Sequence, residues 1–258
     1  MNRKRTLISD TFKVTKRRFT ENTFGKPQCG EADQDGPLDI KSSLEYLMTL
    51  FPRKVFNDSL PTIVMKHQLY SLHSGKTLVD RQLNLLREQG AVMMFQLGFD
   101  ADTFGLVFTA DYKDKVLAGI AGTESQGTVE KFLNKVVPSC TELSFNKDKM
   151  LKEFLFTDSE ITLLVKCGVL TVRDAGSWWL SVPNSGKFTK YLVQGRKAVL
   201  NMVKKARYGE VLKNELEGRR TTSLVKFPIK YHIYDLMGAE LVESIPTTSG
   251  TLLRYVDT

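Results

Sequence analysis

The sequence predicts a mostly α fold with small β-hairpins (α+β), built from three tandem winged-helix domains. Three times along the chain, a helical stretch ends at a glycine and is followed directly by a β-hairpin. The three glycines are Gly90, Gly168 and Gly238, which lie 78 and 70 residues apart. This spacing suits a small helix-turn-helix domain that carries a hairpin wing. One such junction would say little, but three at near-regular spacing favour tandem domains over a single α+β domain with chance recurrences.

The first winged helix is expected at residues 38–120. Glycine adopts the left-handed backbone conformation at little cost, so Gly90 is expected to end the third helix of this domain. Helices are predicted at 40–51, 61–72 and 77–89, and strands at 92–97 and 106–109 around a turn at 98–105.

The second winged helix is expected at residues 125–207, including a basic helix at 187–207. Its best-marked helix starts with the capping box Thr157-Asp158-Ser159-Glu160, in which the threonine and glutamate side chains bond reciprocally to backbone N–H groups. Helices are predicted at 129–137, 146–156 and 158–167, and strands at 169–173 and 177–182.

The third winged helix is expected at residues 208–258 and is shorter. Gly238 is again expected to end a helix, and Thr247-Thr248-Ser249-Gly250 to form the hairpin turn. Helices are predicted at 210–217 and 231–237, with an undecided segment at 224–229, and strands at 241–245 and 251–256.

Residues 1–37 are expected to be a disordered basic tail, because they lack apolar periodicity and residues 1–26 carry a net charge of +6. Their clusters suit nuclear import, nucleic-acid contact or both, with a solubilising tail as the alternative. The basic residues of these clusters are Arg3, Lys4, Arg5, Lys13, Lys16, Arg17 and Arg18.

Several classes of protein are excluded by composition. No apolar stretch approaches the roughly 20 residues that a membrane span requires. Three cysteines without a Cys-x-x-Cys pair fit a reducing compartment and argue against a zinc ribbon. The three histidines are scattered, so no metal or cofactor is expected.

The predicted third helices differ in their capacity to read DNA bases. The helix at 77–89 offers Arg81, Asn84 and Arg87, whereas the helix at 158–167 is acidic and then apolar. The helix at 231–237 offers only a tyrosine, a histidine and an aspartate. Sequence-specific DNA binding is therefore not expected.

The segment 187–207 carries the strongest nucleic-acid signal. Leu192, Val199 and Val203 share one face of the predicted helix, and no acidic residue interrupts its positive charge. A helix face with only positive charges is electrostatically unfavourable unless an anion neutralises it. DNA phosphates can neutralise it whatever the base sequence. The alternative is a merely solvated face. The candidate DNA-binding residues here are Lys190, Arg196, Lys197, Lys204, Lys205 and Arg207, followed in the next loop by Arg219 and Arg220.

Two further motifs lie in the second hairpin. Trp178 shares a face with Leu180 and is expected in the core, whereas Trp179 packs on the basic helix or faces a partner. Arg173-Asp174 superficially matches a kinase catalytic loop, but no histidine precedes it and no Asp-Phe-Gly follows. No catalytic residue is predicted.

Several segments closely resemble the serine/threonine-protein kinase 19 family, now regarded as inactive kinases and also called winged-helix repair factors. The resemblance covers about residues 38–258, and only the basic tail diverges. The segments are Asp158-Ser159-Glu160-Ile161-Thr162, the run from Gly168 to Leu180, and Thr247-Thr248-Ser249-Gly250-Thr251-Leu252-Leu253-Arg254, extended by Phe51-Pro52-Arg53, Asp80-Arg81-Gln82-Leu83 and Gln96-Leu97-Gly98-Phe99-Asp100.

The resemblance implies three winged helices, a nuclear location and binding to double-stranded DNA. It also implies homodimers and a role in transcription-coupled nucleotide excision repair at stalled RNA polymerase II, with Cockayne-syndrome proteins and UV-stimulated scaffold protein, where the family helps to position TFIIH. Family DNA contacts match Lys76, Lys190, Lys204, Lys205, Arg207 and Arg219. The leading hypothesis is a DNA-binding adaptor without catalysis; the alternatives are a protein–protein scaffold and, least favoured, an atypical kinase.

Overall fold

The computed structural model describes residues 39–98, 103–139 and 142–257, which belong to one compact unit. The predicted tail with its seven clustered basic residues, Cys29 and Cys140 lie outside the described residues.

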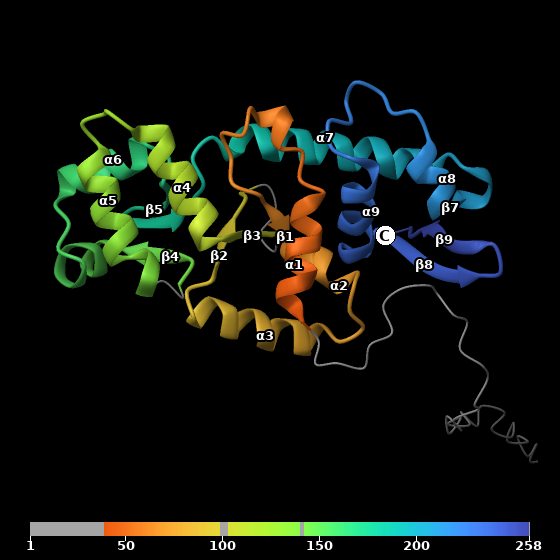
Figure 1. Cartoon of the computed structure of the whole chain (residues 1–258), viewed down its shortest axis with the longest axis horizontal. Helices are drawn as coiled ribbons and strands as arrows, with labels where there is room; N and C mark the ends of the chain where they lie inside the picture. The colour runs from red at the N-terminus through yellow and green to blue at the C-terminus, as the bar shows by residue number, and fades with distance from the viewer. Residues whose placement is uncertain (1–38, 99–102, 140–141, 258) are drawn as a thin grey trace, which may run out of the picture. The chain divides into compact units, whose positions relative to one another are not determined.

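The described residues contain the same order of elements three times: helix, strand, helix, helix, strand, strand (Figure 1). The first repeat holds α1 (Ile40–Thr49), β1 (Val64–Met65), α2 (Lys66–Tyr70), α3 (Lys76–Glu88), β2 (Val92–Gln96) and β3 (Phe104–Phe108). The second holds α5 (Gln126–Lys135), β4 (Ser144–Asn146), the π-helical turn η3 (Lys149–Glu153), α6 (Asp158–Lys166), β5 (Leu170–Asp174) and β6 (Ser177–Leu180). The third holds α7 (Ser185–Lys204), β7 (Glu210–Leu212), α8 (Lys213–Gly218), α9 (Ile229–Gly238), β8 (Val242–Thr247) and β9 (Gly250–Tyr255).

The remaining elements connect these. Helix α4 (Thr109–Ile120) links the first repeat to the second. Short 3-10 turns lie at η1 (Arg53–Phe56), η2 (Val137–Ser139) and η4 (Arg207–Gly209).

Each repeat has its own three-stranded antiparallel sheet, with the last strand of the repeat in the middle. The orders are β1-β3-β2, β4-β6-β5 and β7-β9-β8. The three hairpins are those expected from the sequence, with registers fixed by the pairs Val92 with Phe108, Leu170 with Leu180, and Val242 with Tyr255. An α+β fold with small hairpins is confirmed.

The first strand of each repeat was not predicted, and three predicted helices were therefore too long. Val64–Met65, Ser144–Asn146 and Glu210–Leu212 are strands, where helix was expected over part or all of each. A strand of two or three residues has no readable periodicity and exists because a neighbouring strand pairs with it. Helix α4 was missed as well, and the undecided segment at 224–229 becomes helical only at Ile229, after Pro228.

The glycine prediction was right twice and wrong once. Gly90 and Gly168 have φ values of 69° and 75°, as a left-handed helix end requires. Gly238 is still helical, and the left-handed residue is Glu240 at φ 58°. A Cβ on Gly238 would collide with the backbone carbonyl of His67, so this glycine is there to let α9 approach α2.

The hydrophobic core of the described residues consists of three clusters, one of which takes residues from all three repeats. One cluster runs through the first two repeats and includes Phe188 and Leu192 of α7 together with Phe227 and Tyr231 of the third repeat. Another cluster fills the third repeat and takes Val199 and Val203 from the same helix α7. The two halves of α7 are therefore held by different parts of the core.

Candidate nucleic-acid interface

Helix α7, drawn in teal in Figure 1, has the two faces that the sequence predicts. Leu192, Val199 and Val203 are fully buried, whereas Lys190, Lys197 and Lys204 are exposed. The apolar face thus anchors the helix and leaves the lysines to solvent.

The helix ends earlier than expected, at Lys204, with Lys205 as its C-cap. Arg207 lies beyond it, in η4, where its guanidinium carbon is 5.0 Å from the Tyr208 ring centroid. Arg219 donates a hydrogen bond to the Met202 carbonyl at 3.4 Å, which holds it beside the end of α7. The basic residues therefore continue past the helix into the loops that adjoin it.

Most of these positive charges have no carboxylate partner among the described residues. Lys190, Lys197, Lys205 and Arg220 form no ion pair with a carboxylate of that part of the chain. Lys204 Nζ lies 4.7 Å from the Tyr255 ring centroid, which is a cation–π contact and leaves the positive charge uncompensated. We call Lys190, Lys197, Lys204 and Lys205 the basic face.

Lys76 was matched to a family DNA contact and lies on another repeat, at the start of α3. Its ammonium pairs with Glu240, and both side chains are largely exposed. Exposed pairs of this kind are worth little, so a phosphate competes easily for the lysine.

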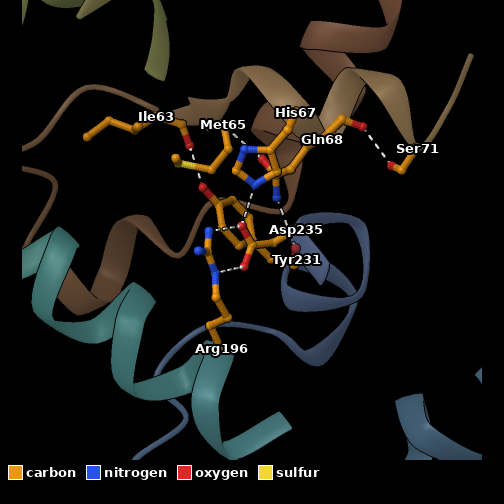
Figure 2. Close-up of polar contacts among 8 residues, drawn as sticks. All are labelled: Ile63, Met65, His67, Gln68, Ser71, Arg196, Tyr231 and Asp235. Atoms are coloured by element: carbon orange, nitrogen blue, oxygen red, sulfur yellow. Dashed lines mark hydrogen bonds and ion pairs between the residues drawn. The ribbon is translucent and has the colours of Figure 1, made fainter. Parts of the chain in front are cut away.

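Arg196 points toward Asp235 (Figure 2), whereas the next residue, Lys197, is exposed. Its Nε and Nη2 donate to the two carboxylate oxygens of Asp235, each at 2.7 Å, and His67 Nε2 lies 2.7 Å from Asp235 Oδ1. Asp235 is completely buried, and a buried charge requires such partners. Grouping Arg196 with the phosphate-binding residues was therefore mistaken, because spacing along a helix cannot reveal an acidic partner 39 residues away.

We call Arg196, Asp235 and His67 the clasp, because they join α7, α9 and α2. Burial would raise the pKa of the Asp235 carboxyl, but the hydrogen bond from His67 and the Arg196 charge outweigh it and hold this pKa well below its usual range. Gln68 reinforces the junction by donating from Nε2 to the Tyr231 carbonyl at 2.9 Å, and the Tyr231 hydroxyl donates to the Ile63 carbonyl at 3.0 Å.

His232 lies beside the clasp and is buried without hydrogen bonds to the described residues. Its ring stacks on Phe227 at a centroid distance of 5.5 Å and meets Gly195, whose missing side chain makes room for it. Burial lowers the pKa of His232 to about 4, so the ring is neutral at physiological pH.

The two tryptophans lie on the wing of the second repeat. Trp178 packs against the core, as expected. Trp179 lies against the Arg173 guanidinium, whose carbon is 4.5 Å from the ring centroid, so this side chain has a contact within the hairpin itself. Arg173 also pairs with Asp174 at 3.2 Å on the exposed hairpin, which accounts for the kinase-like dipeptide as a surface ion pair.

The described residues offer no group of three metal-ligating side chains, and no helix among them is long and apolar enough to cross a membrane. Helix α9, the counterpart of a DNA-reading helix, is almost wholly buried, with Tyr231, His232 and Asp235 all inside. Helix α6 presents Asp158 and Ser159 at its exposed start. Helix α3 exposes Arg81 and Asn84, whose side chains suit base edges.

Residues 41–255 match the model of a family described as inactive serine-threonine protein kinase 19. The chain belongs to this family. A human relative named winged helix repair factor 1 is 51% identical over 252 residues, which cover 98% of this chain and 97% of the human protein. Relatives of the same name from Mus musculus and Xenopus laevis are 48% and 43% identical over the full length of both chains. The description of this family as inactive kinases agrees with the kinase motifs that the sequence lacks.

Proposed function

We propose that this chain is a non-catalytic adaptor that binds double-stranded DNA largely without regard to sequence. The observation that carries the proposal is the basic face, which no described carboxylate neutralises. Phosphate contacts position a protein on a duplex and carry no sequence information. The burial of α9 and the acidic first turn of α6 support the same conclusion, because both features make these two helices poorly suited to contact base edges.

We propose further that each repeat is a winged-helix domain, as the names of the relatives suggest. The domains expected from the sequence, at residues 38–120, 125–207 and 208–258, place the basic helix in the second domain. The repeated element order supports a third domain that begins with α7, because α7 precedes β7 as α1 precedes β1.

The cellular setting is proposed from resemblance. The relatives are named repair factors, which supports a nuclear role in DNA repair, with import through the basic tail. The finer proposal is transcription-coupled nucleotide excision repair at stalled RNA polymerase II, with the Cockayne-syndrome proteins, UV-stimulated scaffold protein and TFIIH as partners and a homodimer as the working form.

The decisive test changes Lys190 and Lys204 together to alanine. Each neutralised phosphate steepens the decline of log affinity with log salt by about 0.9, so the double variant should flatten this slope by up to about two units for every duplex sequence. Affinity is measured by fluorescence anisotropy on unrelated duplexes at several salt concentrations. Thermal stability should hardly change, because exposed charges contribute little to it.

A matched control removes two exposed lysines from other repeats, Lys54 and Lys166, and should keep the wild-type slope. If the Lys190/Lys204 variant binds with wild-type affinity and slope, the basic face is only solvated. The protein–protein scaffold would then be the better proposal.

A further inference from the structure

Tyr208 is the most exposed large hydrophobic side chain of the described residues, at 80%. It follows α7 directly and lies in η4 between Arg207 and Gly209. Tyrosine normally covers its ring against the protein, so an aromatic ring left in water is informative when its surroundings suit a ligand.

The backbone holds this ring in an unfavourable conformation. Tyr208 has φ 60° and ψ 16°, in the left-handed region where a bulky side chain is rare. Gly209 follows at φ 67°, and its N–H donates to the Ala206 carbonyl at 2.9 Å, which fixes the turn. Strain of this kind persists only where the surroundings impose it, and it concentrates at functional sites.

The Arg207 side chain contacts the ring, and two lysines precede it closely along the chain. The Arg207 guanidinium lies 5.0 Å from its centroid, and Arg207 Nη2 is 3.2 Å from the Tyr208 hydroxyl, so the arginine orients the ring. Lys204, the last residue of α7, and its C-cap Lys205 lie four and three residues before Tyr208. Neither these lysines nor Arg207 forms an ion pair with a described carboxylate.

We propose that Tyr208 stacks on an unpaired base, and that the chain therefore prefers duplex DNA that adjoins unpaired bases. An aromatic ring set among cations is the arrangement by which proteins hold single-stranded nucleic acid, with phosphates on the cations and a base on the ring. A base inside a duplex is already stacked on both faces, so only an unpaired or terminal base can accept Tyr208. The proposal rests on duplex binding by the basic face and adds the DNA structure that it selects.

A protein partner is the competing occupant of an exposed tyrosine, since tyrosine is also common in protein interfaces. The charge decides between the two. Interface cores are depleted of lysine, whereas Tyr208 follows two lysines and an arginine without paired acids.

The test compares two DNAs of equal length and charge, one fully paired and one with a short central bubble, by fluorescence anisotropy with the full chain. The wild type should bind the bubble about 5- to 100-fold more tightly, as expected for one stacked base. Tyr208→Asn removes the ring with a residue that tolerates the left-handed conformation, and should abolish this preference. It should leave affinity for the paired duplex within about 2-fold, since the phosphate contacts remain.

Tyr208→Trp should preserve the preference, and 2-aminopurine placed in the bubble should be quenched by the wild type and not by Tyr208→Asn. Equal binding of both DNAs by the wild type, or an unchanged preference in Tyr208→Asn, overturns the inference. So does a Tyr208→Asn variant that loses only self-association, which would mark a protein contact. Failure of the proposed duplex binding would give a different result from failure of the Tyr208 proposal. The Lys190/Lys204 variant would then bind both DNAs with wild-type affinity.

Discussion

Adjacent residues of α7 have opposite tasks. Lys197 is exposed on the basic face, while Arg196 reaches inward to the buried carboxylate of Asp235. Guanidinium suits the inward position because it offers two parallel donors in a fixed plane, and both carboxylate oxygens are used here. Lysine supplies one mobile charge, which is enough for a phosphate and too little for the clasp.

At the same scale, His232 should make stability depend on pH. Its pKa in the folded state is about 4, below the usual value near 6.5, so the unfolded chain binds a proton first as the pH decreases. The neutral ring contributes stability above about pH 6.5, and this contribution is lost between about pH 6.5 and 4. The loss due to His232 should reach about 2 kcal/mol at pH 5. Urea unfolding at pH 7.5 and pH 5, together with an NMR titration of the histidine rings, measures it.

His232→Leu should remove this part of the pH dependence, whereas His73→Gln should retain it. A His232 ring that titrates near pH 6.5 in the folded protein would contradict the prediction.

Among the elements, α9 is the candidate DNA-reading helix with the least exposed surface. Its side chains hold the clasp, the stacked His232 and the hydrogen bonds to α2, so no face is left for a groove. Gly238 completes the packing by letting the two backbones approach.

Gly238→Ala should therefore separate α9 from α2. The added methyl meets the His67 carbonyl, which is backbone and cannot rotate away, and we expect a loss of about 1–3 kcal/mol in the free energy of unfolding. Gly119→Ala is the matched control, because Gly119 lies within helix α4 with open space around it. It should stabilise the protein by up to about 1 kcal/mol. Equal effects of the two substitutions in chemical denaturation would refute this role of Gly238.

The sequence predicted these elements where local signals were strong. The capping box at Thr157 is present, with Glu160 Oε2 accepting from the Thr157 N–H at 2.7 Å, and the hairpins and the buried face of α7 are as expected. Other features could not be predicted because they depend on contacts with segments far away in the sequence. They are the short first strand of each repeat, the inward orientation of Arg196 and the close approach of α9 to α2 at Gly238. Tyr208 was missed because its signal is a backbone angle and an exposure, and neither can be read from residue types.

On the scale of the whole molecule, the three repeats are joined through one hydrophobic cluster to which each of them contributes. The cluster that fills the second repeat continues through Phe51 and Phe56 of the first to Phe188 of α7 and Phe227 of the third. Cutting the chain between repeats would expose this surface to water.

Unfolding of the full chain should therefore be a single transition. Both tryptophans, Trp178 and Trp179, lie in the second repeat, so their fluorescence reports that repeat alone, whereas far-ultraviolet circular dichroism reports helices in all three. The two signals should change at the same denaturant concentration. Separate midpoints would show that the repeats unfold independently.

Helix α7 also has a mechanical consequence. Its 20 residues span about 30 Å, and each half is embedded in a different part of the core. The clasp adds a rigid tie from its middle to the first repeat. A force on the lysines along its outer side is therefore transmitted through α7 to clusters that hold residues of all three repeats.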